Sequence, residues 1–353
     1  MLRLSPLLRG GAAALVVIAA FACGGSPYDL GVTGGSSSSS TVASSSSSVS
    51  SSASSSSSGT GGVGGDPEPA GTLKLTVVNG INDYYAVRLC FLPNDTPWPS
   101  SANGLPFGRS AVITPGASTV PIDGDVTPWV IAGDLSQTDG KTCTEILALA
   151  AADAGTSAIV ARPLGVIPKV VWATNRSLLL VPSGCVGGFA HEDPSATVAC
   201  GMGYTGSSPT AGLTLVSMSR IEDGGHVSLQ AVSASPALPE VDVALLPSLT
   251  DATPRIIAHA LSQGAILPKP PFAALTVTEM GPLDTVQIQT YTPGSMNLSS
   301  TVPLSKVFAN GGPGAAAVVN GARFVLVAVG AGPGLPTDKW WHELTWTLVA
   351  ADP

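Results

Sequence analysis

Charged side chains are scarce in this sequence. Of 353 residues, 15 are Lys or Arg and 23 are Asp or Glu, so only 11% are charged, against roughly 25% in ordinary soluble domains. The net charge of −8 leaves no basic surface for a phosphate backbone, so we expect no nucleic-acid partner. The shortage also argues against an ordinary cytosolic enzyme and against arrays of long charged helices.

Motifs that would mark a specific chemistry are also missing. The cysteines lack the CxxC and CxxH spacings of zinc sites. The many serines never form the GxSxG turn of a hydrolase nucleophile. From the sequence we therefore predict no metal, no cofactor and no catalytic residues.

The first residues read as an export signal. Arg3 and Arg9 precede 13 uncharged residues, Gly10 to Ala22, which are too few to span a hydrocarbon core about 30 Å thick. Ala20-Phe21-Ala22-Cys23-Gly24 resembles the lipobox of bacterial lipoproteins. The resemblance implies a signal peptide over residues 1–22 and acylation of Cys23. The alternative is a plain secretory signal.

Acyl chains on Cys23 would anchor the protein stably, because two lipid signals already suffice for stable attachment. Position +2 is Gly24 and lacks the Asp that retains lipoproteins at the inner membrane, so the outer membrane is favoured. The body would then be periplasmic or surface-exposed. The expected partners are the membrane, through the acylated N-terminus, and an envelope protein or glycan.

A segment rich in Ser and Gly follows the lipidation site. Gly24 to Gly71 contains 19 Ser and 11 Gly in 48 residues, a composition that cannot bury enough apolar surface to fold. We predict that residues 23–71 form a disordered tether with a span of about 35–40 Å. Removing the first 71 residues leaves the rest equally poor in charge.

The remaining sequence predicts an all-β protein. Short alternating segments, such as Leu73 to Val77 and Val227 to Ala231, read as strands with one buried face. Ser177 to Val181 and Phe324 to Val329 are continuously apolar, as expected of strands buried on both faces. Only Thr144 to Asp153 has a helical composition.

These strands recur in two halves. Leu73 to Val78 leads to Val87-Arg88-Leu89-Cys90-Phe91-Leu92-Pro93, and Val227 to Val232 leads to Val241-Asp242-Val243-Ala244-Leu245-Leu246-Pro247. We predict two tandem Ig-like antiparallel β-sandwich domains, over residues 72–221 and 225–353.

The second half carries a family resemblance. Its segment from Val232 to Val243, VSASPALPEVDV, resembles the signature of domain of unknown function 4397, a bacterial extracellular β-sandwich family. The first half keeps Pro106-Phe107-Gly108, a later part of that signature, but departs from it in the opening loop. The resemblance implies a β-sandwich in an exported protein and assigns no catalytic residues.

Four cysteines follow the lipidation site: Cys90, Cys143, Cys185 and Cys200. An even number in an exported protein predicts two disulfides, and four cysteines allow three connectivities. Proximity in the sequence favours Cys185 with Cys200, which leaves Cys90 with Cys143.

Three carboxylates are the best candidates for a rival function, a secreted hydrolase acting on polysaccharide or peptide: Asp123, Asp125 and Glu192. Glu192 belongs to His191-Glu192-Asp193, where a His adjoins carboxylates, but neighbours on a loop point in different directions. Asp123 and Asp125 alone are too few for Ca²⁺, which takes six to eight oxygens. We therefore favour a non-enzymatic lipoprotein with a binding or structural role in the envelope.

Aromatic residues make up 5% of the chain, yet Trp340, Trp341 and Trp346 lie close together. If this segment is one extended strand, Trp340, Trp346 and Leu348 share a core face and Trp341 lies on the other. Trp341 is then the best candidate for an exposed ring that contacts a ligand. This interpretation corresponds to a third function, a carbohydrate-binding module.

Overall fold

The computed structural model describes residues 71–352, apart from 117–118, 153–157, 173–175, 189–190, 248–252, 271, 333–334 and 336–338. These residues all belong to one compact unit, Ala53–Pro353. The predicted signal peptide, Cys23 and nearly all of the predicted tether lie outside them. Among the described residues, no helix is long and apolar enough to cross a membrane.

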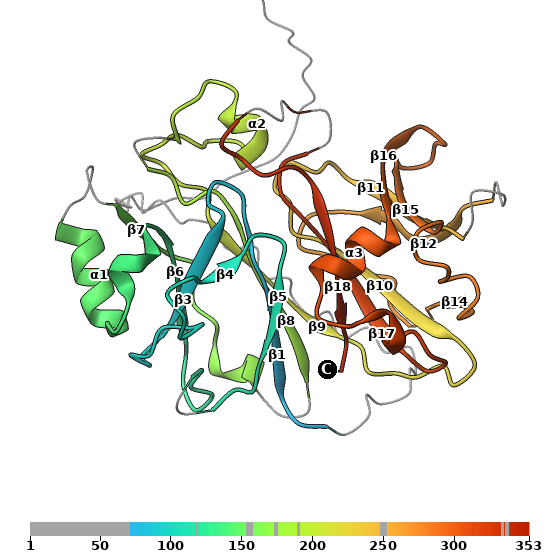
Figure 1. The fold of residues 1–353 in the computed structure, drawn as a ribbon, viewed down its shortest axis with the longest axis horizontal. Helices are drawn as coiled ribbons and strands as arrows, with labels where there is room; N and C mark the ends of the chain where they lie inside the picture. The colour runs from blue at the N-terminus through green and yellow to red at the C-terminus, as the bar shows by residue number, and fades with distance from the viewer. Residues whose placement is uncertain are drawn as a thin grey trace, which may run out of the picture. The chain divides into compact units, whose positions relative to one another are not determined.

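Short strands dominate both halves of the sequence (Figure 1). The first half contains β1 (Lys74–Val78), β2 (Gly80–Ile81), β3 (Ala86–Leu92), β4 (Leu105–Pro106), β5 (Ser110–Ile113), β6 (Thr127–Gly133), η1 (Leu135–Thr138), α1 (Cys143–Ala152), β7 (Ile159–Pro163), η2 (Lys169–Trp172), β8 (Ser177–Gly184), α2 (Ala196–Cys200) and β9 (Gly212–Met218). The second half contains β10 (Val227–Ser233), β11 (Val241–Leu246), β12 (Arg255–Leu261), β13 (Ile266–Leu267), β14 (Ala273–Leu275), β15 (Gln287–Tyr291), β16 (Leu298–Pro303), α3 (Leu304–Asn310), η4 (Ala315–Ala317), β17 (Arg323–Val329) and β18 (Thr345–Ala350).

Each half builds two sheets in the same strand order. In the first half, β9-β8-β1-β5 forms one sheet and β4-β3-β6-β7 the other. In the second half, β18-β17-β10 continues to β13 and β14, and β12-β11-β15-β16 forms the other sheet. The predicted all-β, sandwich-like fold is confirmed. Strand β8 pairs in parallel with β1 and with the short β2, and β17 pairs in parallel with β10, which the sequence patterns did not indicate.

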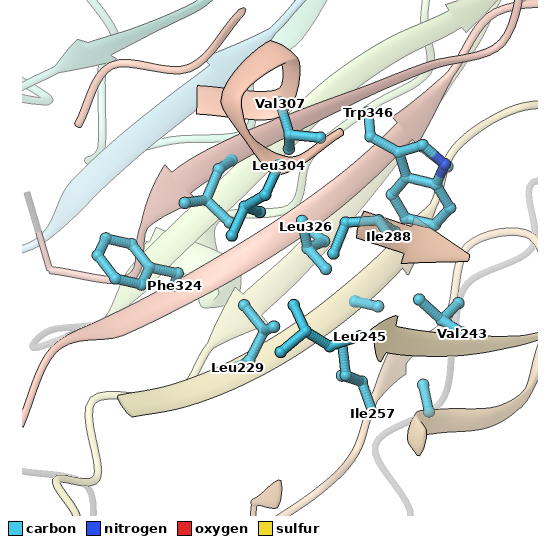
Figure 2. Close-up of a cluster of buried hydrophobic side chains, with 14 of the residues drawn as sticks. Leu229, Val243, Leu245, Ile257, Ile288, Leu304, Val307, Phe324, Leu326 and Trp346 are labelled. Atoms are coloured by element: carbon cyan, nitrogen blue, oxygen red, sulfur yellow. The ribbon is translucent and has the colours of Figure 1, made fainter. Parts of the chain in front are cut away.

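Each half has a core between its two sheets. In the second half, Leu229, Leu326 and Trp346 from one sheet meet Leu245 and Ile288 from the other. Figure 2 shows these side chains converging, with Leu304 and Val307 of α3 closing the same cluster. The equivalent core of the first half joins β1 and β8 to β3 and β6. Trp346 and Leu348 therefore lie on a core face, as predicted.

A further apolar layer joins the two halves. The opposite faces of β1 and β8 supply Val78, Leu179 and Val181 to a buried cluster that also contains Val325 and Val327 of β17. Strands β8 and β17 are therefore buried on both faces, as their continuous apolar sequences predicted. The two sandwiches share this cluster. They meet through the β9-β8-β1-β5 sheet and the β18-β17-β10 sheet, which we call the inner sheets, on the faces that point away from their own cores.

Ion pairs and one pair of stacked rings also connect the two halves beside this apolar layer. The carboxylate of Asp352 lies 3.6 Å from Lys74, 3.7 Å from the buried Arg220 and 4.0 Å from Arg323. Elsewhere, the ring of Phe107 stacks on that of His342, with centroids 4.2 Å apart. Burial lowers the pKa of His342, so this ring stays neutral at physiological pH. Several of the chain's few charges are thus used at the junction.

The halves differ in two insertions. Between β6 and β7 the first half contains η1 and α1, whereas a tight hairpin joins β15 to β16 in the second half. Between β8 and β9, the first half also contains the segment with α2. The helix predicted over residues 144–153 is α1.

The shared layer predicts that the halves are energetically coupled. Leu179→Ala should lower the free energy of unfolding by about 2–5 kcal/mol, because it leaves a cavity in a fully buried cluster. Denaturant titration with separate fluorescent labels on each half should show both halves unfolding together and shifting together. Val112→Ala, at a side chain that is 46% exposed, is the control and should change little. A loss confined to the first half would contradict this coupling.

Candidate functional site

Both predicted disulfides are present, with the pairing that sequence proximity favoured. Cys90 bonds Cys143 and Cys185 bonds Cys200, and all four residues are fully buried. Each disulfide fixes one of the insertions that the second half lacks. The first joins β3 to the start of α1, and the second joins the end of β8 to α2. Two disulfides indicate an oxidising, extracytoplasmic environment.

Trp341 is not an exposed ring. Strand β18 begins only at Thr345, and the chain bends at residues 339–341, so the strand predicted through Trp340 does not form there. Trp341 is 4% exposed and packs in a buried cluster with the Cys185–Cys200 disulfide. The expectation of an exposed, ligand-stacking Trp341 is therefore wrong. That expectation assumed that the alternating pattern of one strand began at Trp340, whereas β18 begins at Thr345.

The same region holds a set of residues that we call the histidine–aromatic cluster: Asp83, Tyr84, His191, Tyr204 and Trp340. The ring of His191 stacks on Trp340 and meets the edge of Tyr84, with ring centroids 4.6 Å apart in each case. Tyr204 lies 6.1 Å from Trp340 between ring centroids. The cluster joins residues of the first half to the segment that precedes β18.

Asp83 is the anionic centre of this cluster. Its side chain is fully buried and accepts hydrogen bonds from the backbone N–H groups of Val186 at 3.0 Å and Gly187 at 2.7 Å. The Nδ1 atom of His191 lies 3.3 Å from the same carboxylate. A buried carboxylate needs such partners, because an unpaired one would have lost its hydration without replacement. Asp83 thereby ties the turn after β2 to the loop after β8.

The two tyrosines act as neutral donors. Burial, together with the nearby Asp83 carboxylate, raises the pKa of Tyr84 to about 12. Burial and Asp83 also raise the pKa of Tyr204. The hydroxyl of Tyr84 donates to the carbonyl of Gly187 at 3.0 Å, and that of Tyr204 donates to the carbonyl of His191 at 3.1 Å. Both phenols therefore fix the backbone of the disulfide-closed loop.

An imidazole oriented by a carboxylate is two thirds of a hydrolase triad. Here the ring of His191 packs between Trp340 and Tyr84. The cysteines of its loop are joined in a disulfide, so they offer no thiolate. The contacts of His191 hold its loop against the turn after β2 and against the segment that precedes β18. Sequence reasoning missed it because Asp83 lies 108 positions from His191.

The carboxylates of the hydrolase hypothesis do not converge. Asp125 accepts a hydrogen bond from the backbone N–H of Lys169 at 2.8 Å, in the loops that precede β6 and β8. Asp123 is exposed in the same turn, and Glu192 is exposed in the loop before α2. Within the described ranges, no three His, Cys, Asp or Glu side chains are grouped so that they could hold a metal ion.

Asp193, next to Glu192, fastens a loop. It accepts hydrogen bonds from the hydroxyl and the backbone N–H of Ser195, and it pairs with Lys339 at 3.0 Å. The Ser195 hydrogen bonds, assisted by Lys339, lower the pKa of Asp193 to about 2. The ion pair joins the loop before α2 to the segment that carries Trp340.

A hollow of about 310 Å³ lies on the outer side of the second half. Its lining residues come from β11, β12, β15 and the hairpin after β15, and are Asp242, Ile256, His259, Tyr291, Gly294, Ser295 and Met296. Asp242 accepts hydrogen bonds from the backbone N–H groups of Ala260 at 2.8 Å and Gly294 at 3.2 Å. The exposed ring of His259 lies 3.6 Å from it.

Asp242 has a counterpart at the equivalent place in the first half, Arg88. The Arg88 guanidinium is buried and donates to the carbonyls of Pro99, Ser100 and Thr138 at 2.8–3.0 Å. Asp242 accepts from backbone N–H groups, whereas Arg88 donates to backbone carbonyls. The two charges are opposite, yet each residue holds the segments beside its own strand, β3 for Arg88 and β11 for Asp242. The carboxylate of Asp242, which lines the hollow, is therefore accounted for by its hydrogen bonds to the backbone of adjacent segments.

No protein-family model and no curated protein matches this chain. The resemblance of residues 232–243 to domain of unknown function 4397 stays a prediction.

The disulfides give a first prediction for this region. Replacing Cys90 and Cys143 by Ser should lower the free energy of unfolding by about 4 kcal/mol, because that disulfide closes a loop of 53 residues. Replacing Cys185 and Cys200, which close a loop of 15 residues, should lower it by about 3 kcal/mol. Guanidinium titrations of the two double variants check this, and each serves as the other's control. A clearly larger loss from the shorter loop would contradict the loop-closure explanation.

The Asp193 fastening predicts a pH effect. Because the pKa of Asp193 is about 2 in the folded protein and near 3.8 when unperturbed, its stabilising contribution is complete above pH 4 and disappears as the pH falls toward 2. Asp193→Asn should therefore flatten the fall of stability over that window. Unfolding titrations at pH 2 to 6 measure it, with exposed Asp123→Asn as the control. An unchanged acid profile would contradict the assignment.

Proposed function

We propose that this chain is a non-enzymatic lipoprotein of the bacterial outer membrane, with a binding or structural role in the envelope. Acyl chains on Cys23 hold it in the membrane, and the segment up to residue 71 spaces the β-sheet body from the surface. The body faces the periplasm or the exterior, where it contacts an envelope protein or glycan.

The observation that carries the export part of this proposal is the pair of buried disulfides. All four cysteines after Cys23 are used in them, so Cys23 is left without a partner in the chain. An unpaired cysteine directly after a signal-like apolar stretch is accounted for by acylation. The disulfides and the lipobox-like sequence therefore support the same route out of the cytosol.

The use of the carboxylates supports the non-enzymatic part. Asp83, Asp125 and Asp242 accept backbone hydrogen bonds from neighbouring loops. Asp193 is held by Ser195 and Lys339. A general acid or base must be able to exchange its proton with a substrate, whereas these groups are engaged in holding loops. Such well-fixed loops suit a body that presents a constant surface.

The membrane anchor predicts a change in cell fractionation. In a Gram-negative host that acylates lipoproteins, the native chain should sediment with the outer membrane, and Cys23→Ala should release most of it into the soluble exported fraction. Release is expected because the lipid chains supply the attachment. Among the described residues, no helix is long and apolar enough to replace them. Immunoblots of separated membranes measure it.

Gly24→Asp is the matched control, because it keeps the acylated cysteine and should move the chain toward the inner membrane. Metabolic labelling with a fatty acid should mark the native chain and the Gly24→Asp variant, but not Cys23→Ala. An unlabelled native chain, or a Cys23→Ala variant that stays in the membrane pellet, would contradict the proposal.

A further inference from the structure

The hollow of the second half lies on the outer face of the sheet β12-β11-β15-β16. Val241 and Val243 of β11 point into the core. Asp242, which stands between them, points outward, because side chains alternate along a strand. In the first half, Arg88 of β3 occupies the equivalent outward position.

The first half covers this outer face with its own chain. Leu135 of η1 and Ile146 of α1 pack in one buried cluster with Cys90 of β3, and Figure 1 shows α1 beside β7. The guanidinium of Arg88 is enclosed there and donates to the carbonyl of Thr138 at 2.8 Å. A tight hairpin replaces η1 and α1 in the second half. A space that the chain fills in one half is therefore left open in the other.

The carboxylate of Asp242 keeps unused acceptor sites at this hollow. An ionised carboxylate offers about four lone-pair sites, and the backbone N–H groups of Ala260 and Gly294 use two of them. The Nδ1 atom of His259, 3.6 Å away, is beyond hydrogen-bond distance. Among the described residues, no Lys or Arg forms an ion pair with Asp242. The backbone therefore fixes the carboxylate in place and leaves it able to accept from a cation that enters the hollow.

The backbone beside the carboxylate is irregular in a way that is frequent at binding sites. The register of β11 against β12 shifts at this point, so His259 and Ala260 together oppose the single residue Asp242 in a β-bulge. Ala260 has a φ of 50°, and it is the only non-glycine residue with a positive φ among those the structure describes. Bulges and strained residues of this kind concentrate at functional sites.

The walls of the hollow suit an alkyl stem. Ile256, Tyr291 and Met296 line it together with the carboxylate. Its volume of about 310 Å³ is at the lower end of the roughly 300–1,000 Å³ of ligand pockets, which is room for one long side chain. Lys and Arg side chains lay their stems along apolar surface while the charged group meets a polar one.

The hollow lies at the end of the second half that is remote from the start of β1. Lys74 and Arg323, the first residues of β1 and β17, lie 3.6 Å and 4.0 Å from the carboxylate of Asp352. Strand β10 runs parallel to β17, so it starts at the same end and reaches the other end at Ser233. The carbonyl of Ser233 accepts from the N–H of Gly264, just after β12, at 2.7 Å. Under the proposed anchoring, the hollow is therefore far from the place where the tether joins the body.

We propose that this hollow receives a lysine or arginine side chain of a partner protein. The cationic group meets the Asp242 carboxylate, and the stem lies along Ile256, Tyr291 and Met296. The net charge of −8 favours a basic partner over a second copy of this chain. Selectivity for the cation follows because charge-assisted hydrogen bonds are about twice as strong as neutral ones. The inference rests on the proposed binding role and gives the chemistry of the partner, but it does not depend on the lipid anchor.

The test is an NMR titration of the purified mature chain, isotope-labelled in its methionine methyl groups, in detergent where acyl chains are present. The probes are the peptide acetyl-Gly-Arg-Gly-amide, its lysine counterpart and its neutral citrulline counterpart. The Met296 signal should shift with a dissociation constant of about 1–10 mM for the cationic peptides, and the citrulline peptide should bind about tenfold more weakly. Met202, which is 97% exposed and does not line the hollow, is the internal control and should not shift.

Two variants locate the binding, followed through the signals of the peptide itself. Asp242→Asn should weaken the arginine peptide about tenfold, and an unfolding titration shows whether the variant stays folded. Met296→Arg places a cation of the chain at the hollow and should abolish binding; its side chain is 71% exposed, so the fold should persist. Met202→Arg is the matched control, because it adds the same charge at an exposed methionine elsewhere, and it should bind like the native chain.

Three results would overturn the proposal. The first is equal binding of the arginine and citrulline peptides, or native-like binding by Met296→Arg. The second is ethylammonium chloride that binds as tightly as the cationic peptides, because the hollow would then take small amines and not a protein side chain. The third is an unshifted Met296 signal at about 50 mM peptide, well above the expected dissociation constant. Each of these leaves the fractionation result for Cys23 untouched, so the two proposals fail separately.

Discussion

The apolar layer between the backs of the two inner sheets is the contact on which the rest of this structure depends. It requires β8 and β17 to be buried on both faces, so the alternation of polar and apolar residues is lost in these two strands, whereas β1 and β10 keep the buried polar residues Thr76, Ser228 and Gln230. In these four strands, charged residues occur only at the first position of β1, Lys74, and of β17, Arg323. This requirement contributes to the low charge of the folded part, which dilution by the Ser- and Gly-rich segment does not explain.

Three of the buried charged residues hold loops. Asp83 follows β2, Arg88 lies in β3 and Asp242 lies in β11, and each binds backbone groups of a neighbouring segment. None of them depends on an opposite charge as its main partner, since backbone dipoles satisfy them. The architecture thus uses single buried charges as connectors, and their sign follows from whether the loop presents N–H or C=O groups.

The sequence predicted the parts of the fold that local patterns control. Continuous apolar runs identified β8 and β17, and spacing alone favoured the pairing of Cys185 with Cys200. Patterns failed where contacts link distant segments. The partner of His191 is Asp83, from another loop, and no neighbouring residue indicates it. Trp341 was misplaced because an alternating pattern does not show where a strand begins; the bend at residues 339–341 is set by tertiary packing.

The parallel pairs also bear on the speed and order of folding. Lys74 pairs with Ser177, about 100 residues later, and Ser228 with Arg323, about 95 residues later, so both closures are slow, non-local events. The Cys90–Cys143 disulfide lies inside the first interval and spans 53 residues of it, which shortens the closing loop by about half. Residues 225–353 contain no cysteine. We therefore expect the first half to close earlier under oxidising conditions and to offer the second half a finished surface on which to assemble, a lead that refolding in reducing buffer should abolish.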